Sequence, residues 1–304
     1  WGNAGGGAAQ SLLPLVVAAM IGLGVEQAWG WRAAMFVPGV AMIAMAFVYA
    51  RYTQDTPQGD IVDLRAKGIQ VDAGKKGGMA IFLQAGRNYR VWMLAATYGA
   101  CFGVEIFIHN IAASYYVDRF GLSIANAGFA AGIFGALALF ARALGGIASD
   151  RIAVRRGLDG RTLLLFGLML GEGVGLVLFS KSDSVALAIG AMALFGLFTH
   201  MACGATYALM PFVDRKALGG VAGLIGAGGN IGAVAAGFLN KATDTPQQTL
   251  LILGLVVAGT SLCAISVRFS AQHKSAEQKL LDAALAERQQ QAGGAHYKPA
   301  GDMA

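Results

Sequence analysis

Long, nearly uninterrupted apolar runs dominate the chain, and short polar or charged segments separate them. A helix needs about 20 mostly apolar residues to cross the hydrocarbon core of a bilayer. Eight runs meet that length and predict membrane-spanning helices at roughly 2–23, 32–50, 91–114, 124–148, 162–180, 185–212, 217–239 and 248–268. The runs lack the apolar-polar alternation of membrane β-strands. The pattern therefore predicts an all-α membrane protein.

Composition supports the same fold class. Of the 304 residues, 56% are hydrophobic and 13% are charged, whereas soluble domains carry about 25% charged residues. So few charges cannot cover a soluble protein of this size. The composition thus excludes a soluble two-domain protein, and the high apolar content excludes a disordered chain.

The basic residues fall on alternate sides of the predicted helices. Of the 23 Lys and Arg residues, 18 lie in one set of connecting segments and in the tail. Basic residues accumulate on the cytoplasmic side of membrane proteins. We therefore expect an integral protein of the cytoplasmic (inner) membrane with a cytoplasmic carboxy-terminal tail. This topology also accounts for the net charge of +6, so nucleic-acid binding is not needed to explain it.

The longest connection divides the chain. We expect residues 1–50 to hold the last two helices of an amino-terminal half, 51–90 a cytoplasmic loop, 91–268 a six-helix half, and 269–304 a cytoplasmic tail. The tail should form a short soluble helix with a disordered end from Gly293. Many transporters are built from repeated helical halves. We therefore expect a fragment with four helices missing upstream, and no signal peptide, because no basic segment precedes the first apolar run.

Arg142 is the most informative polar residue inside a predicted span. It lies eight residues before Asp150, which corresponds to about 12 Å from the cytoplasmic end of a helix. An ionisable group at that depth indicates a functional site, and the planar guanidinium suits an oxyanion. The alternative is a structural ion pair with a carboxylate on another helix, either Glu105 or Glu172.

Glu105 and His109 are one helical turn apart and share a face with Tyr98 and Phe102. A carboxylate and an imidazole at this spacing can hold one proton between them, which makes them candidates for proton coupling. Two alternatives remain open. The residues could form a buried ion pair that fixes the helix, or they could lie solvated near the outer rim.

Three further polar residues fall within apolar runs. Glu172 lies in the middle of a span and is either a proton-coupling site or the counter-charge of another buried group. His200 and Tyr207 are seven residues apart on one helix face, where we expect hydrogen-bonded packing between helices.

No enzyme chemistry is evident in the sequence. The three cysteines, Cys101, Cys203 and Cys263, lie in separate apolar runs, so neither a disulfide framework nor a metal site is indicated. No Ser/Asp/His constellation or paired ligand set stands at depth in the membrane. We therefore expect no catalytic residue, no metal and no cofactor.

Two glycine-rich segments each contain an asparagine. One spans residues 1–10 and includes Asn3, and the other spans 219–232 and includes Gly228, Gly229 and Asn230. Glycine faces let membrane helices pack closely, and this packing explains most of these glycines. An asparagine beside exposed backbone groups can also hydrogen-bond a small ligand.

The segment 145–157 carries a third pattern. Gly145 and Gly146 suggest a close glycine turn, followed by Asp150 and Arg151 and then by Arg155. A charge clamp that forms in only one conformation would act as a gate on the cytoplasmic side. The alternative is that these residues supply only topogenic positive charge.

These motifs resemble a known family. Gly146-x-x-Ser149-Asp150-Arg151-x-x-x-Arg155-Arg156 is similar to the loop motif of the major facilitator superfamily. Residues 1–10 resemble the first signature of its nitrate/nitrite porters, and the segments 204–213 and 223–232 resemble the second. The resemblance runs from Trp1 to about residue 268. It implies a major facilitator superfamily helical bundle with about eight transmembrane helices of an expected twelve.

The resemblance also implies roles for particular residues. Arg142 would bind nitrate, Tyr98 and Phe102 would line the pocket, and the two signatures would contribute Asn3, Gly228, Gly229 and Asn230. Glu105 fits the proton-coupled subgroup of the family. The expected partners are a nitrate or nitrite anion, protons as the coupling ion, and the lipid bilayer.

The sequence therefore favours secondary active import of nitrate or nitrite by alternating access, coupled to protons. Three alternatives remain: a nitrate/nitrite exchanger, a porter of another small anion, and a sensor that binds nitrate without transporting it. A sensor on the same fold would carry the same motifs.

Overall fold

The computed structural model describes residues 4–69 and 78–294. In these residues all repetitive secondary structure is helical, and strand pairing is limited to an isolated bridge between Thr56 and Gly59. The prediction of an all-α protein is confirmed. The residues before position 4, including Asn3, lie outside the described part of the chain.

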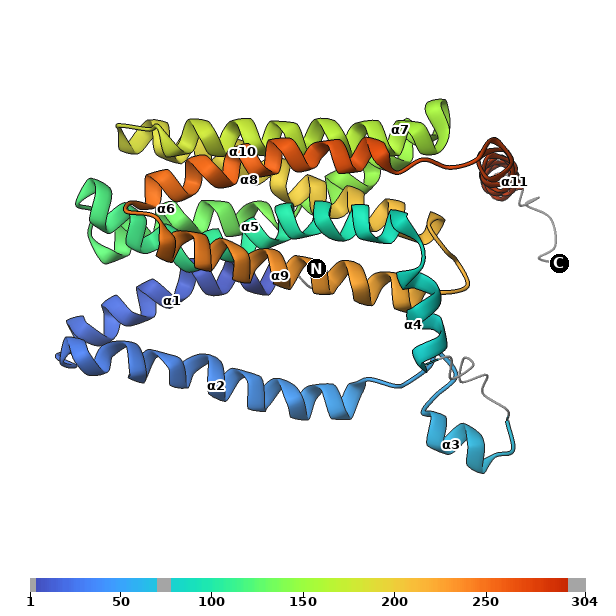
Figure 1. Cartoon of the computed structure of the whole chain (residues 1–304). Coiled ribbons are helices and arrows are strands. Elements are labelled where there is room, and N and C mark those ends of the chain that lie inside the picture. The colour runs from blue at the N-terminus through green and yellow to red at the C-terminus, as the bar shows by residue number, and fades with distance from the viewer. Residues whose placement is uncertain (1–3, 70–77, 295–304) are drawn as a thin grey trace.

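Six long helices form the main bundle (Figure 1). They are α5 (Tyr89–Phe120), α6 (Ile124–Leu137), α7 (Ala141–Ser180), α8 (Val185–Leu209), α9 (Leu218–Ala242) and α10 (Pro246–Ser266). Within it, α5 packs against α9, α10 and α8, while α7 packs against α8 and α10. Large apolar side chains such as Phe238 and Leu255 remain exposed on the outside, as expected of helices in lipid.

The helix α7 contains parts of two predicted membrane spans, 124–148 and 162–180. Gly157 has φ 56° and ψ −146°, a conformation that favours glycine, and it separates an arm at 141–156 from an arm at 158–180. The predicted span at 124–148 is also interrupted, because α6 ends at Leu137 and α7 begins at Ala141. Hydrogen bonds from residue i to i−3 close this short connection, so the crossing is built from two half-helices.

The helices α1 (Ala4–Gly22) and α2 (Gln27–Tyr52) lie beside the bundle (Figure 1). A Cβ placed on Gly128 of α6 would lie 2.5 Å from Pro14 of α1, so this contact is tight. Most of α2 is exposed, and Phe36 and Phe47 present their rings on its surface. An exposed apolar helix of this length is suited to contact with lipid or further helices.

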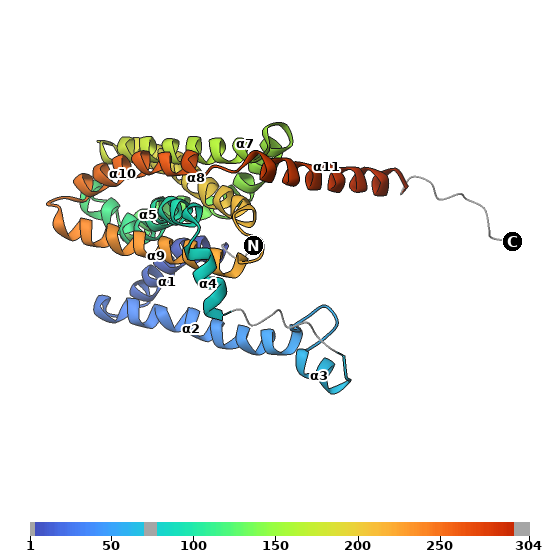
Figure 2. The same ribbon diagram turned by 45° about the vertical axis from the view of Figure 1, so that its right-hand side comes forward.

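Helices also form outside the predicted spans. The expected loop at 51–90 contains α3 (Ile61–Ala66) and α4 (Gly78–Gly86), and the tail forms α11 (Ala271–Gly294). The prediction of a helix in the tail is confirmed. Its expected disordered end lies mostly beyond the described residues. In Figure 1 α11 is seen end-on, whereas Figure 2 shows its length, so it runs across the axis of the bundle.

Glycine contacts bring α5 and α9 together. A Cβ on Gly232 would lie 2.0 Å from the carbonyl oxygen of Gly99, and one on Gly103 would lie 2.6 Å from the carbonyl carbon of Gly232. Both distances are too short for a side chain. The backbones therefore touch directly, which is the packing expected of small residues at membrane helix interfaces.

We predict that Gly232→Ala destabilises the protein, because the new methyl group must separate α5 from α9. The expected loss is about 1–3 kcal/mol, measured as a lower melting temperature of the purified protein in detergent. Gly237 lies on the same helix with open space around it, so Gly237→Ala is the matched control. Equal melting temperatures for the two variants would contradict this account of the interface.

Candidate functional site

A cavity of about 400 Å³ opens between α5, the start of α7, and α8. Its lining consists of two aromatic residues of α5, one arginine of α7 and three residues of α8: Tyr98, Phe102, Arg142, Cys203, Gly204 and Tyr207. The cavity therefore contains one fixed positive charge among aromatic walls. Three of the predicted site residues, Arg142, Tyr98 and Phe102, meet here.

Arg142 lies in the first turn of α7, directly after the break between the half-helices. A Cβ on Gly204 of α8 would lie 2.0 Å from the carbonyl oxygen of Arg142, and one on Gly145 would lie 2.1 Å from the carbonyl oxygen of Met201. The backbones of α7 and α8 are thus in contact at Arg142 and again at Gly145, about one helical turn later. This contact fixes the backbone from which the guanidinium enters the cavity.

The counter-charge of Arg142 is Glu105 on α5. The Nη2 atom of Arg142 donates to Oε1 of Glu105 at 2.6 Å and to Oε2 at 2.5 Å. Both side chains are largely buried, with exposed fractions of 15% and 8%. The Nε atom of Arg142 is buried and has no hydrogen-bond partner in the described residues. The guanidinium therefore uses only one of its three nitrogens to hold Glu105.

Aromatic rings form one wall of the cavity. The rings of Tyr98 and Phe102 stack with centroids 4.9 Å apart and an interplanar angle of 7°, and Tyr207 meets Tyr98 edge-on at 5.3 Å. The guanidinium carbon of Arg142 lies 5.6 Å from the centre of the Phe102 ring. Gly229 supports this wall from behind, because a Cβ there would lie 2.6 Å from Phe102.

The other site residues predicted from the glycine-rich segment 219–232 lie elsewhere. A Cβ on Gly228 would lie 2.5 Å from the carbonyl oxygen of Ala95, so Gly228 serves the contact between α5 and α9. Asn230 is exposed, and its side chain donates to the carbonyl oxygen of Gly226 at 3.1 Å. The structure does not place Asn230 among the residues that line this cavity.

Several titratable groups surround Glu105. His200 Nδ1 lies 3.5 Å from its Oε2, and His109 Nε2 lies 3.9 Å from its Oε1. Cys203 Sγ lies 3.6 Å from Glu105 Oε2 and also 3.6 Å from Cys101 Sγ. All three cysteines are free thiols. The sequence suggested no cysteine pair, yet the fold brings Cys101 and Cys203 together.

Glu172 occupies a separate position on the second arm of α7. It is fully buried, and neither carboxylate oxygen has a hydrogen-bond partner in the described residues. It is therefore not the partner of Arg142. Its proposed part in proton coupling stays a prediction.

One face of α8 contributes a cavity wall that the sequence did not predict. His200, Cys203, Gly204 and Tyr207 follow the spacing i, i+3, i+4, i+7 and so share one face of a helix. From the sequence, His200 and Tyr207 were assigned to packing, Cys203 to an apolar run, and Gly204 to the second signature. The full periodic face, with two polar residues and a glycine, was the signal that could have located this wall.

Comparison with known proteins now identifies the family. A family profile described as "Major Facilitator Superfamily" matches residues 2–237. The chain belongs to the Major Facilitator Superfamily. This membership agrees with the expected helical bundle and with a transporter rather than an enzyme.

The most informative relatives within the superfamily are nitrate transporters. The chain is 37% identical over 266 residues to "High affinity nitrate transporter 2.5" of Arabidopsis thaliana, covering 86% of this chain and 52% of the relative. It is 41% identical over 236 residues to "Nitrate transporter 2.2" of Chlamydomonas reinhardtii, covering 77% and 45%. The chain thus spans about half the length of these relatives. The resemblance to nitrate/nitrite porters is confirmed.

The superfamily loop motif adopts a different shape from the one expected. Gly145 and Gly146 lie within α7, so the predicted glycine turn there is wrong, and the chain turns at Gly157 instead. Gly145 is a glycine because it touches α8. A Cβ on Gly146 would meet open space.

The ion-pair partner of Asp150 lies beyond the turn at Gly157. Its Oδ1 lies 2.8 Å from Nη1 of Arg161, which also donates to the hydroxyl of Ser149 at 2.9 Å. Arg161 is almost completely buried, so the pair joins the two arms of α7. Arg151 and Arg155 remain exposed.

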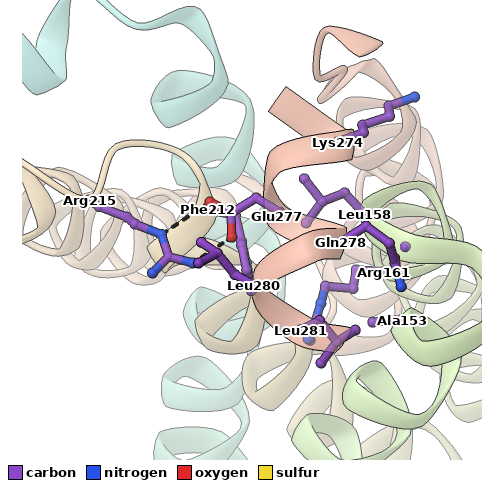
Figure 3. A pocket seen from close by; sticks show the side chains of 11 residues that line it. Ala153, Leu158, Arg161, Phe212, Arg215, Lys274, Glu277, Gln278, Leu280 and Leu281 are labelled. Atoms are coloured by element: carbon purple, nitrogen blue, oxygen red, sulfur yellow. Dashed lines mark hydrogen bonds and ion pairs between the residues drawn. The ribbon is translucent and has the colours of Figure 1, made fainter. Parts of the chain in front are cut away.

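A second cavity, of about 270 Å³, lies where α11 meets α7 and the 3-10 helix η1 (Met210–Phe212) (Figure 3). Glu277 of α11 pairs with Arg215, as the dashed lines in Figure 3 show. Lys274 pairs with Asp159 at 2.6 Å. The sequence suggested no chemistry for the tail. The structure binds it to the end of the bundle where Arg215 and Asp159 lie, which we call the basic end.

We predict that Asp150→Asn lowers the melting temperature of the purified protein, because it leaves the buried Arg161 without its carboxylate. The expected loss is about 1–3 kcal/mol. Arg151→Gln, at the adjacent exposed position of the same arm, is the control and should change stability by less than about 0.5 kcal/mol. If Arg151→Gln destabilises as strongly as Asp150→Asn, the ion pair does not explain the loss.

Proposed function

We propose that the chain forms the anion-binding part of a porter that imports nitrate or nitrite by alternating access. The observation that carries the proposal is the guanidinium of Arg142, which lines an aromatic cavity and keeps its buried Nε free of partners in the described residues. The names of the relatives support nitrate as the anion.

The chemistry of the cavity suits a small planar anion. A guanidinium is a rigid, permanently charged fork that matches planar oxyanions, and the stacked rings of Tyr98 and Phe102 shield the ion from water. Because Gly229 has no side chain, the stacked rings can occupy this position. Asn3, Gly228 and Asn230 stay proposed contributors of polar groups in other conformations of the transport cycle.

Proton coupling follows from competition for Arg142. Glu105 and the transported anion are both negative, and both would bind the same guanidinium. Protonation of Glu105 weakens its hold on Arg142, so a proton and an anion favour the same state of the site. Glu105 is therefore the proposed proton carrier, with His109 and Glu172 as further candidates.

The basic end of the bundle supplies the proposed gate. The pair of Asp150 and Arg161 links the two arms of α7, and the segment also contains Gly146, Arg151 and Arg155. We place this end in the cytoplasm, because basic segments remain on that side. The membrane is the cytoplasmic membrane in this proposal.

We predict that Arg142→Lys reduces nitrate uptake by about 10-fold or more, because lysine keeps the charge but loses the planar fork. That range corresponds to the net contribution of a hydrogen bond to a charged group. The assay is labelled nitrate uptake into proteoliposomes that contain the full-length protein. Arg119→Lys is the control, since Arg119 is exposed at the far end of α5 and pairs with Asp183. Normal uptake by Arg142→Lys would exclude Arg142 as the anion ligand.

A second measurement tests the coupling. We expect an inward proton gradient to accelerate nitrate uptake by the unmodified protein. Uptake that ignores the gradient but requires internal nitrite would instead establish exchange. Nitrate binding without any flux would establish a sensor.

A further inference from the structure

His200 lies next to Glu105, with its Nδ1 atom 3.5 Å from Oε2 of the carboxylate. Its side chain lies in the bundle interior between α8, α5 and α6 and has no exposed surface. Nε2 of the ring lies 3.0 Å from the backbone carbonyl oxygen of Phe134. A carbonyl oxygen only accepts hydrogen bonds, so Nε2 must carry a hydrogen. The contact therefore fixes both the orientation of the ring and its tautomer.

This tautomer decides what Nδ1 can do. In neutral His200 the Nδ1 atom carries a lone pair, and that lone pair faces Glu105 Oε2 at 3.5 Å. Two acceptors then face each other, and Nδ1 is buried with no hydrogen-bond partner in the described residues. Buried polar atoms without partners are rare and need an explanation. One added proton, on either residue, converts the contact into a hydrogen bond.

We propose that Glu105 and His200 hold one proton between them and that this proton accompanies the anion. The inference rests on the proposed function and names the second group of its proton site. Before loading, Arg142 (+1), Glu105 (−1) and neutral His200 sum to zero. One proton and one monovalent anion leave that sum unchanged, so the loaded site in the low-dielectric interior stays neutral.

The surrounding groups are compatible with this assignment. Arg142, His109 and Cys203 contact Glu105, and Cys101 contacts Cys203. Glu172, on the second arm of α7, is near enough to interact electrostatically with Glu105. Arg142 binds Glu105 at the cavity side, whereas His200 approaches it from the interior. His109 lies farther from Glu105 and is 24% exposed, which suits a route by which the proton enters.

The test measures protons taken up when nitrate binds. Purified full-length protein in weakly buffered detergent solution receives nitrate in the presence of a pH indicator, while calorimetry reports binding. We expect the unmodified protein to take up about one proton per anion, so that its affinity falls about tenfold per unit rise in pH over the range in which this uptake occurs. His200→Gln keeps a donor for Phe134 but has no titrating nitrogen. It should bind nitrate with less than a fifth of the proton uptake.

Thr206→Val is the matched control on α8, because Thr206 is buried and its hydroxyl contacts only the carbonyl of Ala202 among the contacts described. It should retain the full proton uptake. If His200→Gln takes up the same proton as the unmodified protein, or if only His109→Gln loses it, the inference is overturned. Failure of the unmodified protein to bind nitrate would instead overturn the proposed function.

A second variant covers the case in which His200→Gln does not fold. Glu105→Gln imitates a protonated carboxyl group, so it should bind nitrate with no proton uptake and with an affinity independent of pH. In the unmodified protein, the nitrate-induced infrared difference spectrum should contain a carboxyl band that Glu105→Gln removes. Proton uptake that persists in Glu105→Gln would overturn the inference.

Discussion

The buried ion pair between Arg142 and Glu105 is the constraint on which the rest of the site depends. Neither charge is stable alone at that depth, and separating a buried pair leaves an uncompensated charge. The pair joins α5 to α7, so it restricts how far these two helices can move relative to each other. In the proposed function, an anion that binds Arg142 replaces part of its contact with Glu105, and this exchange is what would link anion binding to protonation.

Small residues make this geometry possible. Gly204 and Gly145 let α7 and α8 touch at Arg142 and one turn after it, and Gly229 leaves room for the aromatic stack. The same principle joins α5 to α9 through Gly99 and Gly232. Because the backbones are in contact, the charged side chain has few ways to relax. Rigid packing around a single ion pair favours two discrete states, with the pair formed or broken, over a continuous range.

Much of this organisation could be predicted from local patterns. The apolar runs predict the helices, and the spacing of Tyr98, Phe102, Glu105 and His109 places them on one face. The partner of Arg142 could not be chosen, since Glu105 and Glu172 both lie on other spans and only tertiary packing separates them. The turn was placed at Gly145 and Gly146 instead of Gly157, because a glycine needed for close approach looks the same in sequence as one needed for positive φ. His200 was assigned to packing because a histidine within an apolar run looks the same in sequence whether it packs between helices or faces a carboxylate.

The contact of Gly204 with the backbone of Arg142 has a consequence for genetic variation. Gly204 has no side chain to offer a ligand, yet even a single methyl group at this position would collide with the carbonyl of Arg142. A random screen for loss of transport should therefore recover substitutions of this glycine alongside those of the arginine. Collections of loss-of-function alleles would then include this glycine, although its role is only to leave room for the backbone of Arg142.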